Sequence, residues 1–493
     1  MASSESTSQA DAFRSIIQQD PGLPRDNPTT SFWQTPSHKL SSIQSAVLPT
    51  AADIAVIGSG ITGASVVKTI LETHDTAKVV VFEARTVCSG ATGRNGGQLA
   101  VNAAETYIKR REAVGAEMAG KIIEFNFKTL EAMRKIAAQF SDGLTSAEDP
   151  EVTEVTKVRA FQDEEVFTRV KDGVAALESD HPSMRGVFTV LDKEECEKKY
   201  GVHGTVGGVL HPAGSVWPYR LVTNLFEALL TRYAPRLAIE TNTPVTQVTY
   251  EPSTDAKYPY IVHTPRGPVR ASQVAYCTNA YTSHLLENLR GILFPLRETM
   301  TVQELSPPIT RSIPASWAIH YTPYVDQDTG HFADGLIYGM QSAKSGYYFF
   351  GGEKCPPENL ISSDDTAIAE TSVQFLQDQV LSLFGVDTDD SPARSTSKVI
   401  SAWTGVMCFS ADSMPLVGRL PAEITGREGA GEWFSGAYNG YGMPSAWLAG
   451  ESLGLMMLGR TPREYLPEAY LISAERLKEK LSVERSMDFL QAD

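Results

Sequence analysis

Two short apolar runs near the start of the chain are separated by a stretch of helical character. Residues 54–57 read Ile-Ala-Val-Ile and residues 79–82 read Val-Val-Val-Phe, with a glycine turn after the first run. Strands that are apolar at every position are typical of parallel sheets covered on both faces. The pattern therefore predicts a strand, a helix and a second strand in succession, beginning at Asp53.

Longer patterned stretches predict a second region. Apolar side chains between residues 121 and 140 recur at spacings close to helical, which indicates an amphipathic helix. Residues 298–304 and 346–350 are strand-like and lie in a longer mixed stretch. Together they indicate a domain built on an antiparallel sheet.

Two later parts of the chain return to the first pattern. Residues 219–233 are helical and precede short apolar strands at 245–250 and 274–278. Residues 433–436 then lead into a helical stretch over residues 444–458. We therefore expect the first domain to be discontinuous, with the sheet domain inserted into it.

Composition limits the kind of protein and its partners. A chain of 493 residues is too long for one compact core, so two domains or a discontinuous pair are expected. With 43 basic and 59 acidic residues the formal charge is -16, which makes nucleic acid and anionic membranes poor partners. Five scattered cysteines without a CxxC pair argue against a disulfide framework or a zinc site and fit a reducing compartment.

The sequence predicts a soluble, cytoplasmic protein without a membrane span. Residues 1–19 hold no apolar signal-peptide core, and no run of about 18 apolar residues occurs. The last residues, Leu-Gln-Ala-Asp, are not the Ser-Lys-Leu peroxisomal address, although other import routes leave a peroxisomal location open.

A glycine turn follows the first strand and matches the GxGxxG pattern of dinucleotide sites. Gly58 permits the tight turn, Gly60 lets a pyrophosphate approach the backbone, and Gly63 allows close packing of helix on strand. The helix N-terminus then faces the phosphates. Glu83 ends the second strand, where a carboxylate accepts hydrogen bonds from ribose hydroxyls and disfavours a 2'-phosphate, and hence NADP.

This fingerprint alone does not distinguish NAD from FAD, because both share an adenosine diphosphate half. Residues 89–98, Ser-Gly-Ala-Thr-Gly-Arg-Asn-Gly-Gly-Gln, form a loop with little side-chain bulk that suits close approach to a flat ring. Residues 436–443, Gly-Ala-Tyr-Asn-Gly-Tyr-Gly-Met, precede a helix whose N-terminus favours negative charge. These distant glycine loops favour FAD, and no metal is expected.

At these segments the chain resembles the D-amino-acid oxidase superfamily of FAD-dependent enzymes, in its glycine and sarcosine oxidase-like branch. Within that branch it is most similar to the gamma-glutamylputrescine oxidase-like enzymes of fungal type. Further matching segments are residues 208–218, 278–281, 351–352 and 403–418. Their order and spacing carry the resemblance over nearly the whole chain.

The resemblance implies an α/β fold, with a Rossmann-like FAD-binding domain and an inserted α+β substrate domain on an antiparallel sheet. The FAD-binding domain is expected to comprise residues 51–110, 205–290 and 400–475, and the substrate domain residues 111–204 and 291–399. Residues 1–50 are expected to form an arm over the surface and residues 476–493 a tail. The residues expected to contact FAD are Gly58, Ser59, Gly60, Ile61, Thr62, Gly63, Glu83, Ala84, Arg85, Ser89, Gly90, Ala91, Thr92, Gly96, Gly97, Gln98, Val245, Thr278, Asn279, Asn439, Gly440, Gly442 and Met443.

The resemblance also implies the reaction, which is oxidation of the carbon beside an amine to give an imine that water hydrolyses. The electron acceptor is expected to be oxygen. However, the oxygen-activating lysine of sarcosine oxidase relatives falls in the strand matching residues 347–352, where Tyr348, Phe349 and Phe350 stand. Lys354 and Lys344 are the candidates to replace it. If neither does, the acceptor is something other than oxygen.

Other departures concern the flavin linkage and the substrate. Some relatives tether FAD through a cysteine, but Gly405 stands at that position and Cys408 follows three residues later. Arg297 is the candidate to bind a substrate carboxylate through a bidentate pair.

Tyr347, Trp403 and Tyr438 are candidates for pocket walls, and Tyr438 for catalysis, while His211 and His320 are possible proton relays. The alternatives to an oxidase are an FAD-dependent amine dehydrogenase that uses a quinone or carrier protein and a non-catalytic flavin-binding protein. The sequence leaves the amine, the flavin linkage and the oligomeric state open.

Overall fold

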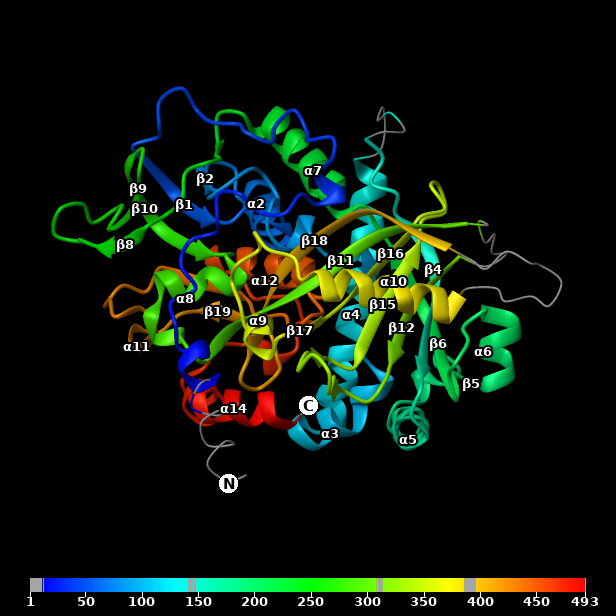
Figure 1. Ribbon diagram of the computed structural model, residues 1–493. Helices are drawn as coiled ribbons and strands as arrows, with labels where there is room; N and C mark the ends of the chain where they lie inside the picture. Colours follow the sequence, from blue (N-terminus) through cyan, green and yellow to red (C-terminus); the bar gives the residue numbers. More distant parts are fainter. Residues whose placement is uncertain are drawn as a thin grey trace.

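The computed structural model describes residues 11, 13–140, 145, 148–306, 308, 314–384 and 396–492. Two sequence predictions fall partly outside these residues. They concern most of residues 1–19, where a signal peptide was sought, and the last residue, Asp493, where a peroxisomal signal was sought. Two large sheets stand side by side in the molecule, with helices packed around them (Figure 1). We call them the nucleotide sheet and the substrate sheet.

The nucleotide sheet has the strand order β19-β20-β10-β1-β2-β7, and the hairpin of β8 and β9 extends it from β10. Strands β20, β10, β1, β2 and β7 are parallel. The bounds are β1 (Ala51–Ile57), β2 (Val79–Phe82), β7 (Leu237–Glu240), β8 (Gln247–Tyr250), β9 (Tyr260–Thr264), β10 (Gly267–Tyr276), β19 (Leu416–Arg419) and β20 (Glu432–Gly436).

Burial on both faces explains the unbroken apolar run of β1. Ile54 and Val56 belong to a hydrophobic cluster formed with side chains of the helices that cover one face of the sheet. Ala55 and Ile57 belong to a second cluster on the opposite face. Helix α2 packs against α12, which also contacts α4 and β20. The helices are α2 (Ile61–Thr73), α4 (Ala116–Gln139), α7 (Pro218–Tyr233) and α12 (Ala446–Met457).

The substrate sheet has the order β18-β11-β16-β15-β12-β4-β6-β3, with β5 paired to β6. Its pairs are antiparallel except for β12 and β4, which run parallel. The bounds are β3 (Gln98–Leu99), β4 (Thr153–Phe161), β5 (Thr189–Asp192), β6 (Gly207–Ser215), β11 (Leu293–Ser306), β12 (Ala315–His320), β15 (Leu336–Gln341), β16 (Tyr348–Gly352) and β18 (Thr396–Ser410).

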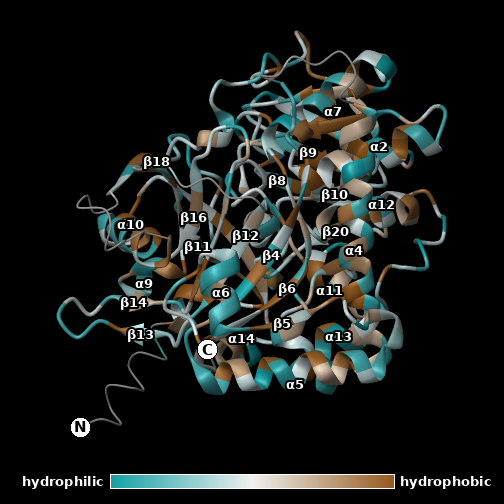
Figure 2. Cartoon of the chain, turned by 90° about the vertical axis from the view of Figure 1, so that its right-hand side faces the viewer, coloured by the Kyte–Doolittle hydropathy of each residue, from teal (hydrophilic) through white to brown (hydrophobic). Residues whose placement is uncertain are grey.

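The remaining elements lie around these sheets. A small sheet joins β13 (Tyr324–Val325), β14 (Phe332–Ala333) and β17 (Lys354–Cys355). The other helices are α3 (Tyr107–Val114), α5 (Glu164–Asp180), α6 (Lys193–Tyr200), α8 (Thr282–Leu285), α9 (Pro357–Leu360), α10 (Glu370–Phe384), α11 (Ala422–Thr425), α13 (Ala474–Glu479) and α14 (Val483–Ala492). Hydrophilic positions mark α5 and α6 at the surface (Figure 2). None of the described helices is long and apolar enough to span a bilayer.

The predicted fold class is confirmed, and the predicted strands and helices fall within or overlap the observed elements. Two features differ from the expected boundaries. Strand β6 belongs to the substrate sheet by its pairing with β4, although the FAD-binding domain was expected to include residues from 205 onward. Strand β3 likewise pairs with β6. The division of the chain into domains stays a prediction.

The expectation that residues 1–50 lie over the surface is wrong for the part around Trp33. This side chain is buried, its ring stacks on Phe349 at a centroid distance of 4.4 Å, and its Nε1 donates to the Asn95 carbonyl at 2.6 Å. Upstream, Thr29 donates its backbone N–H to the Asp365 carbonyl. Burial of Trp33 is favourable because the ring buries a large apolar area and its N–H keeps a hydrogen-bond partner.

Candidate active site

The turn between β1 and α2 admits only glycine at two positions. Gly58 has a φ of +105°, and a Cβ there would lie 2.6 Å from the Cys277 carbonyl oxygen. A Cβ on Gly63 would lie 2.1 Å from the Gly58 carbonyl oxygen. Helix α2 then begins with Gly60 as its N-cap, without a side-chain cap. This geometry leaves the positive end of the helix facing the cavity that Gly60 and Ile61 line.

The Glu83 carboxylate is held in place where β2 ends. Its Oε2 accepts hydrogen bonds from the hydroxyl and the backbone N–H of Ser59 at 2.6 and 3.1 Å, and its Oε1 accepts from the Arg85 N–H at 3.0 Å. The Ser59 side chain therefore orients Glu83. A carboxylate has about four acceptor sites and these bonds use three, so about one site remains for a ribose hydroxyl of a dinucleotide.

The two predicted flavin loops are shaped by asparagines and glycines. Asn439 has a φ of +52°, and its side chain accepts from the Ser410 N–H and donates to the Ala437 carbonyl. Asn279, with a φ of +48°, accepts from the Ala437 N–H at 3.1 Å. In the other loop, Gly90 has open space where a Cβ would stand.

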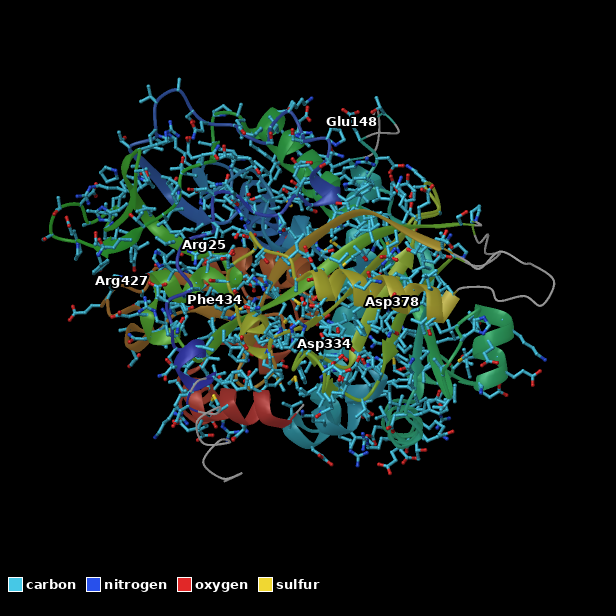
Figure 3. The ribbon with its side chains drawn as sticks, viewed as in Figure 1. Arg25, Glu148, Asp334, Asp378, Arg427 and Phe434 are labelled. Carbon is cyan, nitrogen blue, oxygen red and sulfur yellow. The ribbon has the colours of Figure 1, made fainter. Side chains whose placement is uncertain are left out.

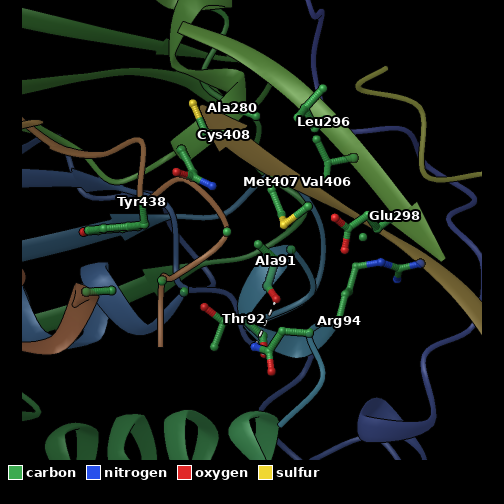
Figure 4. A pocket seen from close by; sticks show the side chains of 18 of the residues that line it. Ala91, Thr92, Arg94, Ala280, Leu296, Glu298, Val406, Met407, Cys408 and Tyr438 are labelled. Atoms are coloured by element: carbon green, nitrogen blue, oxygen red, sulfur yellow. Dashed lines mark hydrogen bonds between the residues drawn. The ribbon is translucent and has the colours of Figure 1, made fainter. Parts of the chain in front are cut away.

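A cavity of about 550 Å³ runs between these segments. Figure 4 shows Thr92, Met407 and Tyr438 arranged around it, with Glu298 on a strand that passes above. The predicted FAD contacts that line it are Gly58, Ser59, Gly60, Ile61, Thr62, Glu83, Ala84, Arg85, Gly90, Ala91, Thr92, Gly96, Gln98, Val245, Thr278, Asn279, Asn439, Gly440, Gly442 and Met443. Gly63, Ser89 and Gly97 are not among the lining residues.

These residues fit FAD. The start of α2 suits a pyrophosphate, because Gly60 adds no side-chain cap and, among the described residues, the Ile61 N–H donates only to the Thr92 hydroxyl at 3.0 Å. Glu83 suits a ribose, and the open space at Gly90 suits a flat group against the backbone. Arg85 contributes differently from expectation, because its guanidinium pairs with the buried Asp365 at 2.9 Å. Among the described residues, no group of three or more His, Cys, Asp or Glu is arranged to hold a metal ion.

The structure places Arg297 and Lys354 away from the cavity lining. Arg297 lies on the opposite face of β11 from Glu298, and its guanidinium donates to the Asp364 carbonyl at 2.9 Å. Lys354 pairs with Asp326 at 2.6 Å, which raises the pKa of the lysine. The structure thus does not bring either residue to the position that the sequence interpretation required.

Lys344 also lies outside the lining, where it pairs with Asp149 at 2.8 Å. Tyr438 does line the cavity, but its hydroxyl hydrogen-bonds Thr62 at 3.0 Å and Ser435 at 2.9 Å. Burial raises the pKa of Tyr438 above its usual value. Its contacts join the start of α2 to the C-terminal glycine loop, which is a structural role.

The other candidates divide between the cavity and the core. Gly405 and Cys408 line the cavity, and burial raises the pKa of the Cys408 thiol. Trp403 lies in the core and donates its Nε1 to the Arg94 carbonyl at 2.7 Å. Neither His211 nor His320 belongs to the lining, and burial lowers the pKa of His320 to about 4.

Sequence reasoning missed a charged wall that closes one side of the cavity. It consists of Lys157 and Arg159 on β4, Glu298 on β11, and Asp334 and Tyr338 at and beside β15. Figure 3 labels Asp334 in the central part of the molecule. Because side chains two residues apart in a strand share a face, the spacing of Lys157 and Arg159 was the signal available in the sequence.

The two cations of this wall are buried. Arg159 forms an ion pair with Glu105, donates to the Val101 carbonyl at 2.5 Å, and donates through Nε to His211 at 3.2 Å. Lys157 donates to the side-chain oxygen of Gln98 and to a backbone carbonyl of β12 at 2.5 Å. Burial, and secondarily the charge of Arg159, lowers the pKa of Lys157 well below its usual value.

The carboxylates of the wall are perturbed in the opposite sense. Burial raises the pKa of Glu298 to about 7, although a hydrogen bond from Tyr338 opposes the shift. The Glu298 Oε2 atom is buried and has no hydrogen-bond partner among the described residues. Burial also raises the pKa of Asp334, and the nearby charge of Glu298 adds to the effect. Opposed pKa shifts within one cavity are a mark of functional sites.

Comparison with known proteins identifies the family. Residues 53–454 match the model of the family DAO, described as FAD dependent oxidoreductase. The chain belongs to this family. It is therefore an FAD-dependent oxidoreductase, and the FAD prediction is confirmed at the level of the family.

The similar proteins span nearly the same length. The gamma-glutamylputrescine oxidoreductase of Escherichia coli (strain K12) is 23% identical over 444 residues, which cover 88% of this chain and 90% of the relative. Glycine oxidase from Geobacillus kaustophilus matches with a TM-score of 0.63 at 16% identity, over 86% of this chain and 99% of that one. L-proline dehydrogenase from P. horikoshii matches with a TM-score of 0.63 at 16% identity, over 88% and 100%.

Proposed function

We propose that this oxidoreductase oxidises the C–N bond of an amine or amino acid to an imine, with oxygen as electron acceptor. Bound FAD supplies the two-electron chemistry. The observation that supports this best is the continuity of the cavity, which runs from the dinucleotide turn at Gly58, past Gln98, to the charged wall at Lys157, Arg159 and Glu298. A substrate on this wall lies in the same cavity as the flavin loops.

The relatives support the same class of substrate. Their names refer to gamma-glutamylputrescine, glycine and L-proline, each of which has a carbon bonded to an amine nitrogen. The lining of this chain offers matching chemistry, because the carboxyl groups of Glu298 and Asp334 can hydrogen-bond an amine nitrogen and the Arg159 guanidinium can donate to a carboxylate. We propose the residues of the charged wall, rather than Arg297, as the substrate contacts.

A specific observation favours a second candidate for the electron acceptor. The strand that carries the oxygen-activating lysine in sarcosine oxidase relatives presents Phe349, whose ring is stacked on Trp33. Lys344 and Lys354 both lie outside the cavity lining. A dehydrogenase that passes electrons to a quinone or a carrier protein is therefore the alternative, and peroxide formed per amine consumed separates the two.

The test is an anaerobic panel of amines and amino acids mixed with the purified, FAD-loaded protein. Bleaching of the flavin absorbance by at least one member is the expected result, and a stoichiometric peroxide yield on admitting air supports the oxidase. Bleaching without peroxide supports the dehydrogenase. Tight FAD binding without bleaching by any member of a broad panel supports the non-catalytic flavin-binding protein and contradicts the proposal.

A further inference from the structure

A buried lysine of the charged wall has no chemical role in the function proposed so far beyond its place among the substrate contacts. Lys157 is only 2% exposed and lines the cavity from β4. It lies where the two predicted flavin loops approach each other. Its Nζ donates to Gln98 of the first loop, and its strand neighbour Arg159 hydrogen-bonds Tyr441 of the second. Lys157 and residues of both loops therefore line the same cavity.

The hydrogen bonds of Nζ match a neutral amine. A neutral lysine has two N–H donors and one lone pair, and the two acceptors around Nζ are the Gln98 Oε1 and the Trp317 carbonyl oxygen. With both donors engaged, the lone pair remains for a donor in the cavity. The pKa of Lys157 is lowered well below its usual value, mainly by burial, which favours this neutral form.

The reaction itself creates the need for such a group. Aliphatic amines are ammonium ions near neutral pH, and an ammonium has no free electron pair with which to form the C=N bond of an imine. We propose that Lys157 accepts the proton of the bound substrate ammonium, so that the amine is oxidised in its neutral form. The inference rests on the proposed function and adds a proton acceptor to it.

The step balances without a further reactant. The lone pair of Nζ forms the new N–H bond, and the electrons of the broken N–H bond stay on the substrate nitrogen. Lys157 becomes an ammonium with three donors, two of which already have acceptors in Gln98 and the β12 carbonyl. It loses this proton to water when the product leaves.

Among the surrounding charges, that of Arg159 lowers the pKa of Lys157 and opposes the transfer, whereas that of Glu105 raises this pKa and favours it. Arg159 is itself balanced by Glu105. Glu298 is the rival proton acceptor, since its buried Oε2 has no partner in the part of the chain that the structure describes. The titratable groups facing Lys157 or lining the same wall are Arg159 on β4, Glu105 in the turn before α3, His211 on β6, His320 on β12, Glu298 on β11, and Asp334 and Tyr338 at β15.

The first test compares the pH dependence of flavin bleaching at saturating amine in the wild type, Lys157→Met and Lys157→Arg. Methionine preserves the volume without a basic nitrogen, and arginine is always charged and accepts no proton. Both variants are expected to slow bleaching about tenfold for each pH unit below the pKa of the bound amine, reaching about 100-fold at two units, and to approach the wild-type rate at high pH. Lys135→Met, on the exposed face of α4, is the surface control.

The second test is an equilibrium measurement that needs no turnover. The probe is the active amine carrying two methyl groups in place of hydrogen on the carbon beside its nitrogen, which prevents oxidation. Calorimetry in buffers of different ionisation enthalpy counts the protons released on binding. At a pH above the pKa of the bound amine and below that of the free amine, Lys157→Met is expected to release about one proton more than the wild type, because the proton that Lys157 retains must then leave to the buffer.

The outcomes separate this inference from the function it rests on. Equal proton release and superimposed pH profiles in the wild type and Lys157→Met overturn the role of Lys157. So does an acid loss that appears in Glu298→Gln and not in Lys157→Met. A wild-type protein that no amine bleaches defeats the proposed function instead. Unchanged FAD content and urea midpoint in each variant show that its fold is intact.

Discussion

The substitution Gly63→Ala tests whether the start of α2 must pack directly on the preceding turn. Gly63 has no unusual backbone conformation, and alanine is favoured over glycine in a helix by about 1 kcal/mol. On helix propensity alone, the variant would be more stable than the wild type. The packing predicts the opposite, because the new Cβ would lie 2.1 Å from the Gly58 carbonyl oxygen.

The size of the effect follows from this distance. Ordinary contacts of a Cβ begin at 3.4 Å, so the helix and the turn must separate by about 1.3 Å, and no side-chain rotation relieves a clash with backbone. Overpacking of this kind costs about 1–3 kcal/mol. If the displaced turn also misplaces the amides that face the pyrophosphate, the same energy corresponds to roughly tenfold to hundredfold weaker FAD binding.

The assay measures two quantities on apoprotein, the urea midpoint and the dissociation constant for FAD from quenching of flavin fluorescence. Gly90→Ala is the matched control, because a Cβ at Gly90 meets nothing within 4 Å but enters the cavity. It is expected to keep the urea midpoint and weaken FAD binding, whereas Gly63→Ala lowers both. A Gly63→Ala protein with wild-type stability and FAD affinity would refute the reasoning.

Three further changes have defined outcomes. Asp365→Asn removes the carboxylate shared by the buried guanidiniums of Arg85, 2.9 Å away, and Arg94, 3.6 Å away. It should lower the free energy of unfolding measured in urea by about 3–5 kcal/mol, because both cations lose their partner. A loss below about 1 kcal/mol contradicts the pairing. Burial raises the pKa of Glu298 from 4.5 to about 7, so the folded state binds an extra proton between these pH values. The wild type should therefore lose stability relative to Glu298→Gln as the pH rises from 4.5 to 7. A stability difference that does not depend on pH argues against the shift. Lys354→Met should leave reoxidation of the flavin by oxygen within about twofold of wild type, and a loss of 100-fold would restore Lys354 to the site.

The nucleotide site was predictable because local geometry specifies it. Gly58 and Gly63 are required by a positive φ and by a backbone contact, and both constraints act over a few residues. The position of Glu83 was predictable because it comes directly after the second strand of the dinucleotide motif. Such features are visible in a sequence, since the residues that form them are neighbours in the chain.

The substrate wall was not predictable in the same way. Arg297 and Glu298 are adjacent in a long buried strand, and only the register of β11 against β16 and β18 decides which of them faces the cavity. Lys157 and Arg159 resemble the solvent face of an ordinary strand until β4 is placed beneath the flavin loops. Similarly, the burial of Trp33 depends on Phe349, more than 300 residues away.

The central claim is that this chain is an FAD enzyme that oxidises amines, and anaerobic bleaching tests it most directly. The purified, FAD-loaded protein is mixed with each member of a panel of amines and amino acids in the absence of oxygen, and the flavin absorbance is followed. The account predicts that at least one amine bleaches the flavin completely and that its imine hydrolysis product appears in equal amount. A protein that binds FAD but is bleached by no amine, or that does not bind FAD at all, would contradict it.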